Sequence, residues 1–253
     1  MSKKTSVTLE EHWPLERRRQ LDAVVALLAT VYGRRRWRPH HPPLDELIMT
    51  VLSQHTSDVN TERAYRSLRH RFPTWDEALR APTDEVAAAI RSGGLAPIKA
   101  PRIQAILCSI ARERGSLNLD HLAGLSLEEA RRWLLRLGGV GPKTAACVLL
   151  FSLGRPALPV DTHVHRVARR IGLIAPTTDA AAAHVVLESG LGTDRDRVYD
   201  FYLNAIAHGR DVCTARRPFC ERCPLTGDCD YYAADRDRAD AATASPPPAS
   251  GGR

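Results

Sequence analysis

Four cysteines lie close together near the end of the sequence, with the spacing C-x6-C-x2-C-x5-C. They are Cys213, Cys220, Cys223 and Cys229. Zinc sites usually pair two C-x2-C knuckles across a longer loop, whereas this compact and asymmetric loop favours an iron–sulfur cluster held by four thiolates. The other two thiols, Cys108 and Cys147, lie on apolar helical stretches and are expected in the core.

A glycine-rich segment, Leu137–Ala145, joins two predicted helices and contains Gly-Gly-Val-Gly-Pro-Lys. Its glycines at 139 and 141 permit positive φ and close backbone approach, and Val140 would anchor the turn in the core. Pro142 is placed where a helix begins, and the free N–H groups of such a helix start suit a phosphate. A plain helical hairpin with a glycine stop would explain a shorter pattern, so the longer one favours phosphate binding. The candidate contacts are Gly139, Val140, Gly141 and Thr144.

Asp161 follows Lys143 by 18 residues and precedes a helix whose buried stripe begins at Val164. As a simple N-cap it would contribute about 1 kcal/mol. If the fold brings it near a basic amine, the same carboxylate could activate that amine or stabilise a cation. Both interpretations are open at this point.

The elements that must position these residues are helices. Apolar residues recur at intervals of three and four, and no stretch of five or more alternates as a half-buried strand would. One helix is expected to end at Gly33, a second to begin after Pro42 and Pro43, and a third to begin at the capping box of Ser126 and Glu129. The sequence therefore predicts an all-α protein.

The composition is that of a globular protein with an excess of positive charge. The 253 residues are 43% hydrophobic, enough for one large core or two modest ones, and the formal net charge of +7 indicates a polyanionic partner. Only four of the 36 cationic side chains are lysines, namely Lys3, Lys4, Lys99 and Lys143. An amine can lose its proton and attack carbon, which a guanidinium cannot readily do.

The chain shows no sign of membrane insertion or secretion. No apolar run approaches the roughly 18–20 residues that would cross a bilayer, and the N-terminus lacks the apolar core of a signal peptide. We expect a cytoplasmic protein, nucleoid-associated if the source is prokaryotic, with no membrane partner. In a reducing cytosol the cysteines are better interpreted as ligands than as disulfides.

The hairpin, the segment Val160–His163 and the four-cysteine loop occur in an order that resembles the endonuclease III family of DNA glycosylases. The resemblance runs from about Leu21 to Tyr232 and implies two helical domains with a cleft that holds an extruded base. They are a six-helix barrel over 45–155 and a [4Fe–4S] cluster domain over 18–44 with 156–232. Residues 1–17 are expected to be a loose N-terminus and 233–253 a disordered tail.

The resemblance implies that Lys143 is the nucleophile and Asp161 the catalytic carboxylate of a bifunctional glycosylase and abasic-site lyase. The expected substrate is double-stranded DNA with oxidised pyrimidines or abasic sites, bound by a monomer. A monofunctional mismatch or uracil glycosylase is an alternative that Lys143 disfavours, because members that only remove bases carry another residue there. A non-catalytic iron–sulfur DNA-binding protein is a third possibility, which the presence of both Lys143 and Asp161 disfavours.

The remaining candidate DNA contacts are polar residues in two loops. The family often places Gln in Leu-Ser-x-Gln, but here His55 stands at that position and Gln54 one residue earlier, so either could fill the gap left by a flipped base. Arg216 and Arg217 match the basic loop that the family presents to phosphate. For Lys99, in a second glycine-led turn, an exposed position is slightly favoured over a capping or phosphate-binding role.

Overall fold

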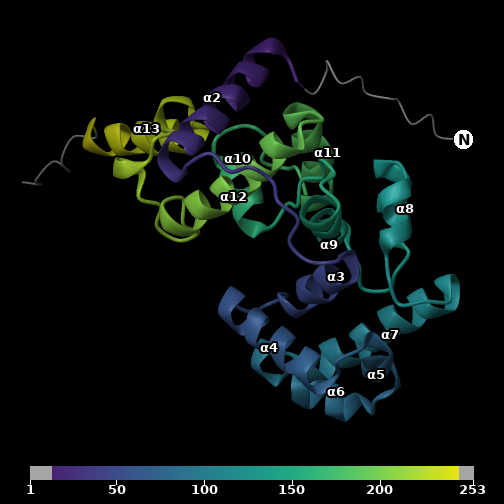
Figure 1. The fold of residues 1–253 in the computed structure, drawn as a ribbon. Coiled ribbons are helices and arrows are strands. Elements are labelled where there is room, and N and C mark those ends of the chain that lie inside the picture. The colour runs from purple at the N-terminus through teal and green to yellow at the C-terminus, as the bar shows by residue number, and fades with distance from the viewer. Residues whose placement is uncertain (1–12, 245–253) are drawn as a thin grey trace, which may run out of the picture. The chain divides into compact units, whose positions relative to one another are not determined.

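The computed structural model describes residues 13–244, and it describes side chains as far as residue 237. Helices are the regular secondary structure of this part, which contains no β-strand, so the predicted all-α class is confirmed. None of the helices described is long and apolar enough to cross a membrane. The chain divides into two compact units, whose helices are labelled in Figure 1.

Unit 2 comprises residues 36–159 and 193–199. Its helices follow one another through short connections and bury their apolar faces in one core. The elements are α3 (Pro43–Leu52), α4 (Asp58–Arg71), α5 (Trp75–Arg80), α6 (Thr83–Ala89), η1 (Arg91–Gly93), α7 (Ala96–Arg114), η2 (Asp120–Gly124), α8 (Leu127–Leu135), α9 (Pro142–Cys147) and the π-helix η3 (Val148–Ser152).

Unit 2 begins at residue 36, earlier than the predicted barrel boundary at 45. The cause is Trp37, whose indole nitrogen donates to the carbonyl of Leu150 at 2.6 Å. The backbone N–H of Trp37 also donates to the carboxylate of Asp196 at 2.9 Å, and the Arg195 guanidinium stacks on its ring at 4.5 Å. These contacts attach both the 36–42 segment and the 193–199 segment to unit 2.

Unit 1 comprises the described parts of residues 1–35, 160–192 and 200–253. Within it α11 packs on α2 and α10 packs on α13. Its elements are α2 (Leu15–Tyr32), α10 (Thr162–Arg170), α11 (Ala180–Leu191), most of α12 (Arg195–Asp211), the short η4 (Cys220–Arg222) and η5 (Thr226–Asp228), and α13 (Asp230–Ala244).

The prediction of a loose N-terminus over 1–17 is wrong for residues 13–17. Trp13 is 2% exposed, and its indole nitrogen donates to the carbonyl of Val186 at 2.7 Å. Helix α2 then begins at Leu15. A single buried tryptophan therefore orders the chain just ahead of the helix, and residues 1–12 lie outside the described part.

The prediction of a disordered tail from residue 233 is wrong as far as Ala244, where α13 ends. The first turn of α13 is anchored by Tyr231, which lies 4.6 Å under the guanidinium of Arg170. The alanine-rich sequence that follows has a high intrinsic helix propensity, although its apolar pattern is weak. Residues 245–253 lie outside the described part.

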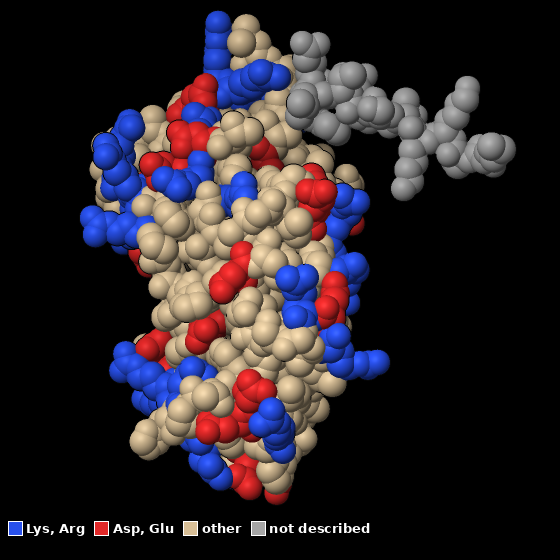
Figure 2. All heavy atoms as spheres, turned by 45° about the vertical axis from the view of Figure 1, so that its right-hand side comes forward, with Lys and Arg blue, Asp and Glu red and all other residues tan. Residues whose placement is uncertain are grey.

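The surface charges are mixed in sign. On the face shown in Figure 2, Lys and Arg side chains lie among Asp and Glu side chains and form no single continuous basic surface. The net charge of +7 therefore does not by itself locate a DNA-binding surface on this face.

Lys99 is buried in unit 2 at 1% exposure, so the favoured expectation of a surface position is wrong. Its ammonium donates to the carbonyl of Leu52 at 2.6 Å and to that of Gly93 at 2.8 Å. Leu52 is the last residue of α3 and Gly93 the last of η1. Lys99 thus has the capping role, and burial lowers the pKa of its ammonium.

Lys99→Met retains the apolar stem of the side chain but leaves two buried carbonyls without a donor. Each such acceptor costs about 1–3 kcal/mol, so we expect the free energy of unfolding to fall by about 2–4 kcal/mol. Urea unfolding followed by circular dichroism measures this change. Ile98→Met, at the exposed neighbouring position, is the control and should change stability by less than about 0.5 kcal/mol. An unaltered unfolding midpoint for Lys99→Met would contradict the capping role.

Candidate active site

The turn between α8 and α9 has the compact geometry that its glycines predict. The backbone N–H of Val140 donates to the carbonyl of Leu137 at 3.0 Å. Gly139 has a φ of +85°, and a Cβ there would come within 2.7 Å of the Arg102 side chain, so glycine is required on both counts. Gly141 has a φ of −94° and open space around it, so the positive φ that this second glycine would permit does not occur.

Two of the predicted hairpin contacts have buried side chains. Val140 is 6% exposed and Thr144 is 4% exposed. Contact between either residue and DNA would therefore have to involve backbone groups. Pro142 is the first residue of α9, as predicted, and α9 continues directly into the π-helix η3.

Lys143 lies in the first turn of α9, and α9 packs against α3. Cys147 follows one helical turn later, and its buried thiol is influenced by Lys143 and by Thr50 of α3. Burial raises the pKa of the Cys147 thiol, and the neighbouring Lys143 lowers it.

Glu46 is a further polar group of this cluster that sequence reasoning missed. It lies on α3 one turn before Thr50, and its side chain is only 8% exposed. Burial raises the pKa of its carboxyl to about 7, and the positive charge of Lys143 acts in the opposite direction. The charge of Glu46 also acts on Cys147. The only signal in the sequence is a glutamate beside a strongly apolar stripe, which a solvated position would explain equally well.

Gln54 and His55, the two candidates for filling the gap left by a flipped base, have different environments in the loop after α3. The side-chain oxygen of Gln54 accepts a hydrogen bond from Arg102 of α7 at 2.8 Å, whereas His55 is exposed. His55 has a φ of +54°, one of two positive values at non-glycine residues in the part of the chain that is described; the other is at Leu95. Non-glycine residues in this region are strained and often occur at functional sites.

Lys99 forms hydrogen bonds close to both of these residues with positive φ, His55 and Leu95. Its ammonium binds the carbonyl of Leu52, three residues before His55, and its backbone N–H donates to the carbonyl of Leu95 at 2.9 Å. Arg102, on the same helix, donates to Gln54, and its side chain lies where a Cβ at Gly139 would be. Helix α7 therefore connects the loop after α3 with the glycine turn before α9. Neither Lys99 nor Arg102 was expected in this role from the sequence.

Asp161 is the N-cap of α10 in unit 1, as the sequence predicts. One carboxylate oxygen accepts the backbone N–H of His163 at 2.9 Å and that of Val164 at 2.8 Å. Lys143 belongs to unit 2. The structure therefore assigns the two predicted catalytic residues to different units, each at the start of a helix.

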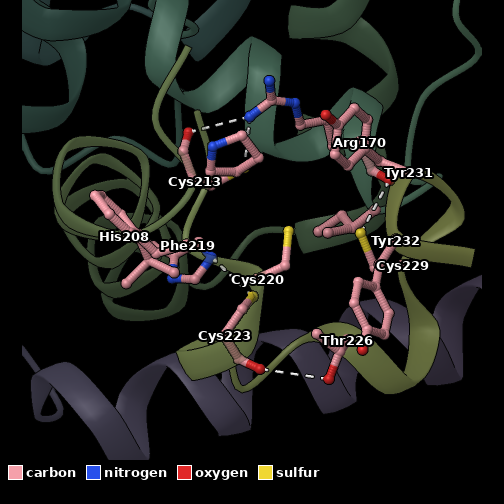
Figure 3. A pocket seen from close by; sticks show the side chains of 13 residues that line it. Arg170, His208, Cys213, Phe219, Cys220, Cys223, Thr226, Cys229, Tyr231 and Tyr232 are labelled. Carbon is pink, nitrogen blue, oxygen red and sulfur yellow. Dashed lines mark hydrogen bonds between the residues drawn. The ribbon is translucent and has the colours of Figure 1, made fainter. Parts of the chain in front are cut away.

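The four predicted cysteine ligands are free thiols that line one cavity in unit 1. Figure 3 shows this cavity, with Cys213, Cys220, Cys223 and Cys229 around it. Its other walls are largely apolar and aromatic and include Phe219. Among the described residues, no group of three or more His, Cys, Asp or Glu side chains is arranged to hold a single metal ion.

Helix α10 supports the loop that carries the first cysteine. Arg166 donates to the carbonyl of Cys213 at 2.9 Å, and Arg170 donates to the carbonyl of Thr214 at 2.7 Å. Arg170 also reaches the sulfur of Cys213 at 3.3 Å, a contact drawn in Figure 3. The loop that begins at Cys213 is thus attached to the helix that Asp161 caps.

Burial dominates the electrostatics of the cysteine cavity. Burial and, to a smaller extent, the neighbouring thiols raise the pKa of Cys223 to about 11, against the opposing effect of a backbone hydrogen bond from Leu225. Burial also lowers the pKa of His208 to about 4, so this ring is neutral at neutral pH. A ring nitrogen of His208 lies 3.5 Å from the Cys223 sulfur. A positively charged group bound in the cavity would favour the thiolate forms.

The remaining predicted residues have simple environments. Arg216 and Arg217 are both exposed in the loop between Cys213 and Cys220. The hydroxyl of Thr214 donates to the carbonyl of Arg217 at 2.6 Å, which orders the loop backbone. Cys108 is exposed, so its expected core position is wrong, whereas Cys147 is buried as expected.

Comparison with known proteins identifies the class. Residues 48–188 match the helix–hairpin–helix HhH-GPD superfamily of base excision DNA repair proteins. The structure is similar to that of an endonuclease III trapped in a covalent intermediate with DNA, with a TM-score of 0.73 and 27% sequence identity. That alignment covers 87% of this chain and 98% of the other.

Sequence relatives support the same class. An Arabidopsis thaliana protein named as a DNA glycosylase is 39% identical over 73% of this chain and 65% of its own length. Endonuclease III of Thermotoga maritima is 36% identical over 75% of this chain and 84% of its own length. The match thus spans slightly less than two thirds of the plant protein. The chain belongs to the endonuclease III family of helix–hairpin–helix DNA glycosylases.

The buried carboxyl of Glu46 makes stability depend on pH. Its pKa is about 7 in the folded protein against an ordinary value of 4.5, so between these pH values the folded protein binds more protons than the unfolded chain. The free energy of unfolding therefore falls as pH rises through this window, by about 3 kcal/mol in total. We expect Glu46→Gln to gain more stability relative to wild type at about pH 8 than at about pH 5.

Urea unfolding of both proteins at the two pH values measures this difference. The control is Glu62→Gln, which removes an exposed carboxylate paired with Arg66 and should show no such pH dependence. A Glu46→Gln variant with the same stability increment at both pH values would show that the carboxyl is not desolvated.

Proposed function

We propose that this protein is a bifunctional DNA glycosylase and abasic-site lyase that acts on double-stranded DNA. The observation that carries the proposal is Lys143 in the first turn of α9, directly after the glycine turn. A primary amine held at the start of a helix, beside backbone groups suited to phosphate, can form a Schiff base with a sugar carbon. The covalent DNA intermediate of the similar endonuclease III supports the same chemistry.

The reaction requires a nucleotide that is flipped out of the duplex. The neutral amine of Lys143 forms a bond to C1′ while the bond from C1′ to the damaged base breaks, and the base leaves with the electron pair. Opening of the sugar ring gives a Schiff base between Lys143 and C1′. Loss of a proton from C2′ then expels the 3′ phosphate by β-elimination, and water releases the lysine.

Asp161 is proposed to stabilise the positive charge that develops on the sugar. Its carboxylate is oriented by two backbone N–H groups of α10. A fixed negative charge of this kind costs no reorganisation during the reaction. This division of roles leaves Lys143 as the group that forms the covalent bond.

Oxidised pyrimidines are the proposed substrates, together with abasic sites. Damage that weakens stacking or pairing lowers the cost of extruding a base, which favours such lesions. We assign the gap left by the flipped base to His55, because His55 is exposed while Gln54 is bound by Arg102. Arg216 and Arg217, both exposed, are proposed to contact the phosphate backbone. The protein is proposed to act as a monomer.

The cysteine cavity is proposed to hold a [4Fe–4S] cluster. Four free thiols line one largely apolar cavity, and four cysteine thiolates are the donor set of such clusters. Cys213, Cys220, Cys223 and Cys229 would hold it. When bound, the cluster would fix the loop of Arg216 and Arg217, and the chain's own contribution to that order is the set of contacts from Arg166 and Arg170.

Lys143→Gln tests the nucleophile. With an abasic-site duplex and borohydride, the wild-type protein should form a covalent adduct, and the variant should form none because its amide cannot make a Schiff base. Gel electrophoresis detects the adduct, and fluorescence anisotropy checks that the variant still binds the duplex. An undiminished adduct in Lys143→Gln would exclude Lys143 as the nucleophile. On a duplex that carries thymine glycol, release of the base by the wild-type protein without any adduct would favour a monofunctional glycosylase.

Elemental analysis tests the cluster. The purified protein should be brown and contain about four iron atoms per chain. Cys220→Ser should lose most of this iron, whereas Cys108→Ser, which changes an exposed thiol outside the cavity, should retain it. A colourless protein that contains zinc would contradict the assignment.

A further inference from the structure

Glu46 is a buried carboxyl that the reaction described above does not use. It lies on α3, whose other buried residues are apolar apart from Thr50. Burying a carboxyl without need is unfavourable, since an apolar side chain would pack at the same position with no loss of solvation. Its presence on a helix that packs against α9 therefore calls for an explanation in terms of the charged group that acts on it.

The group that Glu46 faces is Lys143. Glu46 and Thr50 are one turn apart on α3, and Lys143 and Cys147 are one turn apart on α9, so residues of both helices form one polar cluster. The charge of Lys143 acts on both Glu46 and Cys147, and the charge of Glu46 acts on Cys147 in turn. Glu46 is 8% exposed, whereas Lys143 is partly exposed.

The proposed chemistry needs a neutral amine at Lys143. An ammonium has no free electron pair with which to form a bond to carbon. Its proton must therefore move to a base before each attack. Transfer from an ammonium to a buried carboxylate turns two charges into two neutral groups, and a poorly solvated environment favours that change.

We propose that Glu46 receives the proton that the Lys143 ammonium loses before the amine attacks C1′. The N–H bond of the ammonium breaks, an O–H bond forms on the carboxylate, and the electron pair stays on the amine nitrogen. The long and flexible lysine side chain allows the two groups to meet. This inference rests on the proposed function, because it takes Lys143 as the nucleophile. Glu46 acts through Lys143 and is therefore a positioning residue.

Asp161 is less suited to this task. One of its carboxylate oxygens already accepts two backbone N–H groups, which hold it at the start of α10. The Glu46 carboxyl is buried instead, and burial raises its pKa to about 7, which makes it a stronger base. The two carboxylates thus have separate roles, Asp161 for the sugar cation and Glu46 for the lysine proton.

The other titratable groups near α3 are engaged elsewhere. Asp45, on α3 itself, accepts the hydroxyl of Tyr65 from α4. Lys99, from α7, binds the carbonyl at the end of α3. From α9, the groups that face Glu46 are Lys143 and Cys147.

Single-turnover cleavage of an abasic-site duplex, followed from roughly pH 5.5 to 9.5, tests the proposal. We expect Glu46→Gln to cleave about ten- to a hundredfold more slowly than wild type at about pH 7. The rate should recover toward wild type near the alkaline end, because hydroxide there replaces the missing carboxylate. The apparent pKa of the rate profile should shift upward accordingly, and Glu46→Asp should recover part of the neutral-pH rate.

Controls separate this proposal from the function on which it rests. Glu62→Gln, which removes an exposed carboxylate of α4, should keep the wild-type profile. Thermal unfolding and binding to an uncleavable abasic-analogue duplex check that Glu46→Gln is folded and binds DNA. A Glu46→Gln profile equal to that of wild type, or lowered by one factor at every pH, overturns the role of Glu46. Cleavage by Lys143→Gln would instead overturn the proposed nucleophile.

Discussion

The packing of α9 against α3 is the interaction on which the candidate active site depends. It places Lys143 and Cys147 among polar groups of α3 that are buried in a mainly apolar core. A lysine fully exposed to water keeps its proton near neutral pH, whereas one beside a buried carboxyl has a nearby acceptor in a weakly solvated environment. The glycine turn before α9 and the π-helix after it fix where this short helix lies.

One helix in each unit supports the loops that carry candidate site residues: α7 in unit 2 and α10 in unit 1. From α7, Lys99 donates to the carbonyl at the end of α3, and Arg102 donates to Gln54. These two hydrogen bonds hold the loop that carries His55. From α10, two arginines bind the loop that begins at Cys213, while Asp161 caps the other end of the same nine-residue helix. The cysteine loop and Asp161 are thus attached to the same helix.

Local features of the fold were predictable because each depends on residues that are neighbours in sequence. The capping box of Ser126 and Glu129 starts α8, and the Asp161 side chain caps α10. A turn or a cap involves one short stretch of backbone, so its residue types are sufficient evidence. Trp13 shows the limit, because a tryptophan in a polar segment gives no sign that it will bind a carbonyl 173 residues away.

By itself, the sequence determined the all-α class, the four-cysteine loop and a lysine at the start of a helix after a glycine turn. Only the tertiary structure decided that Glu46 is buried toward Lys143, that Lys99 is a buried cap, and that Gln54 is engaged while His55 is exposed. The reason is that helical periodicity tells which residues share a face but not which face another helix covers. The ionisation of a buried side chain depends on that covering, because desolvation and nearby charges set its pKa.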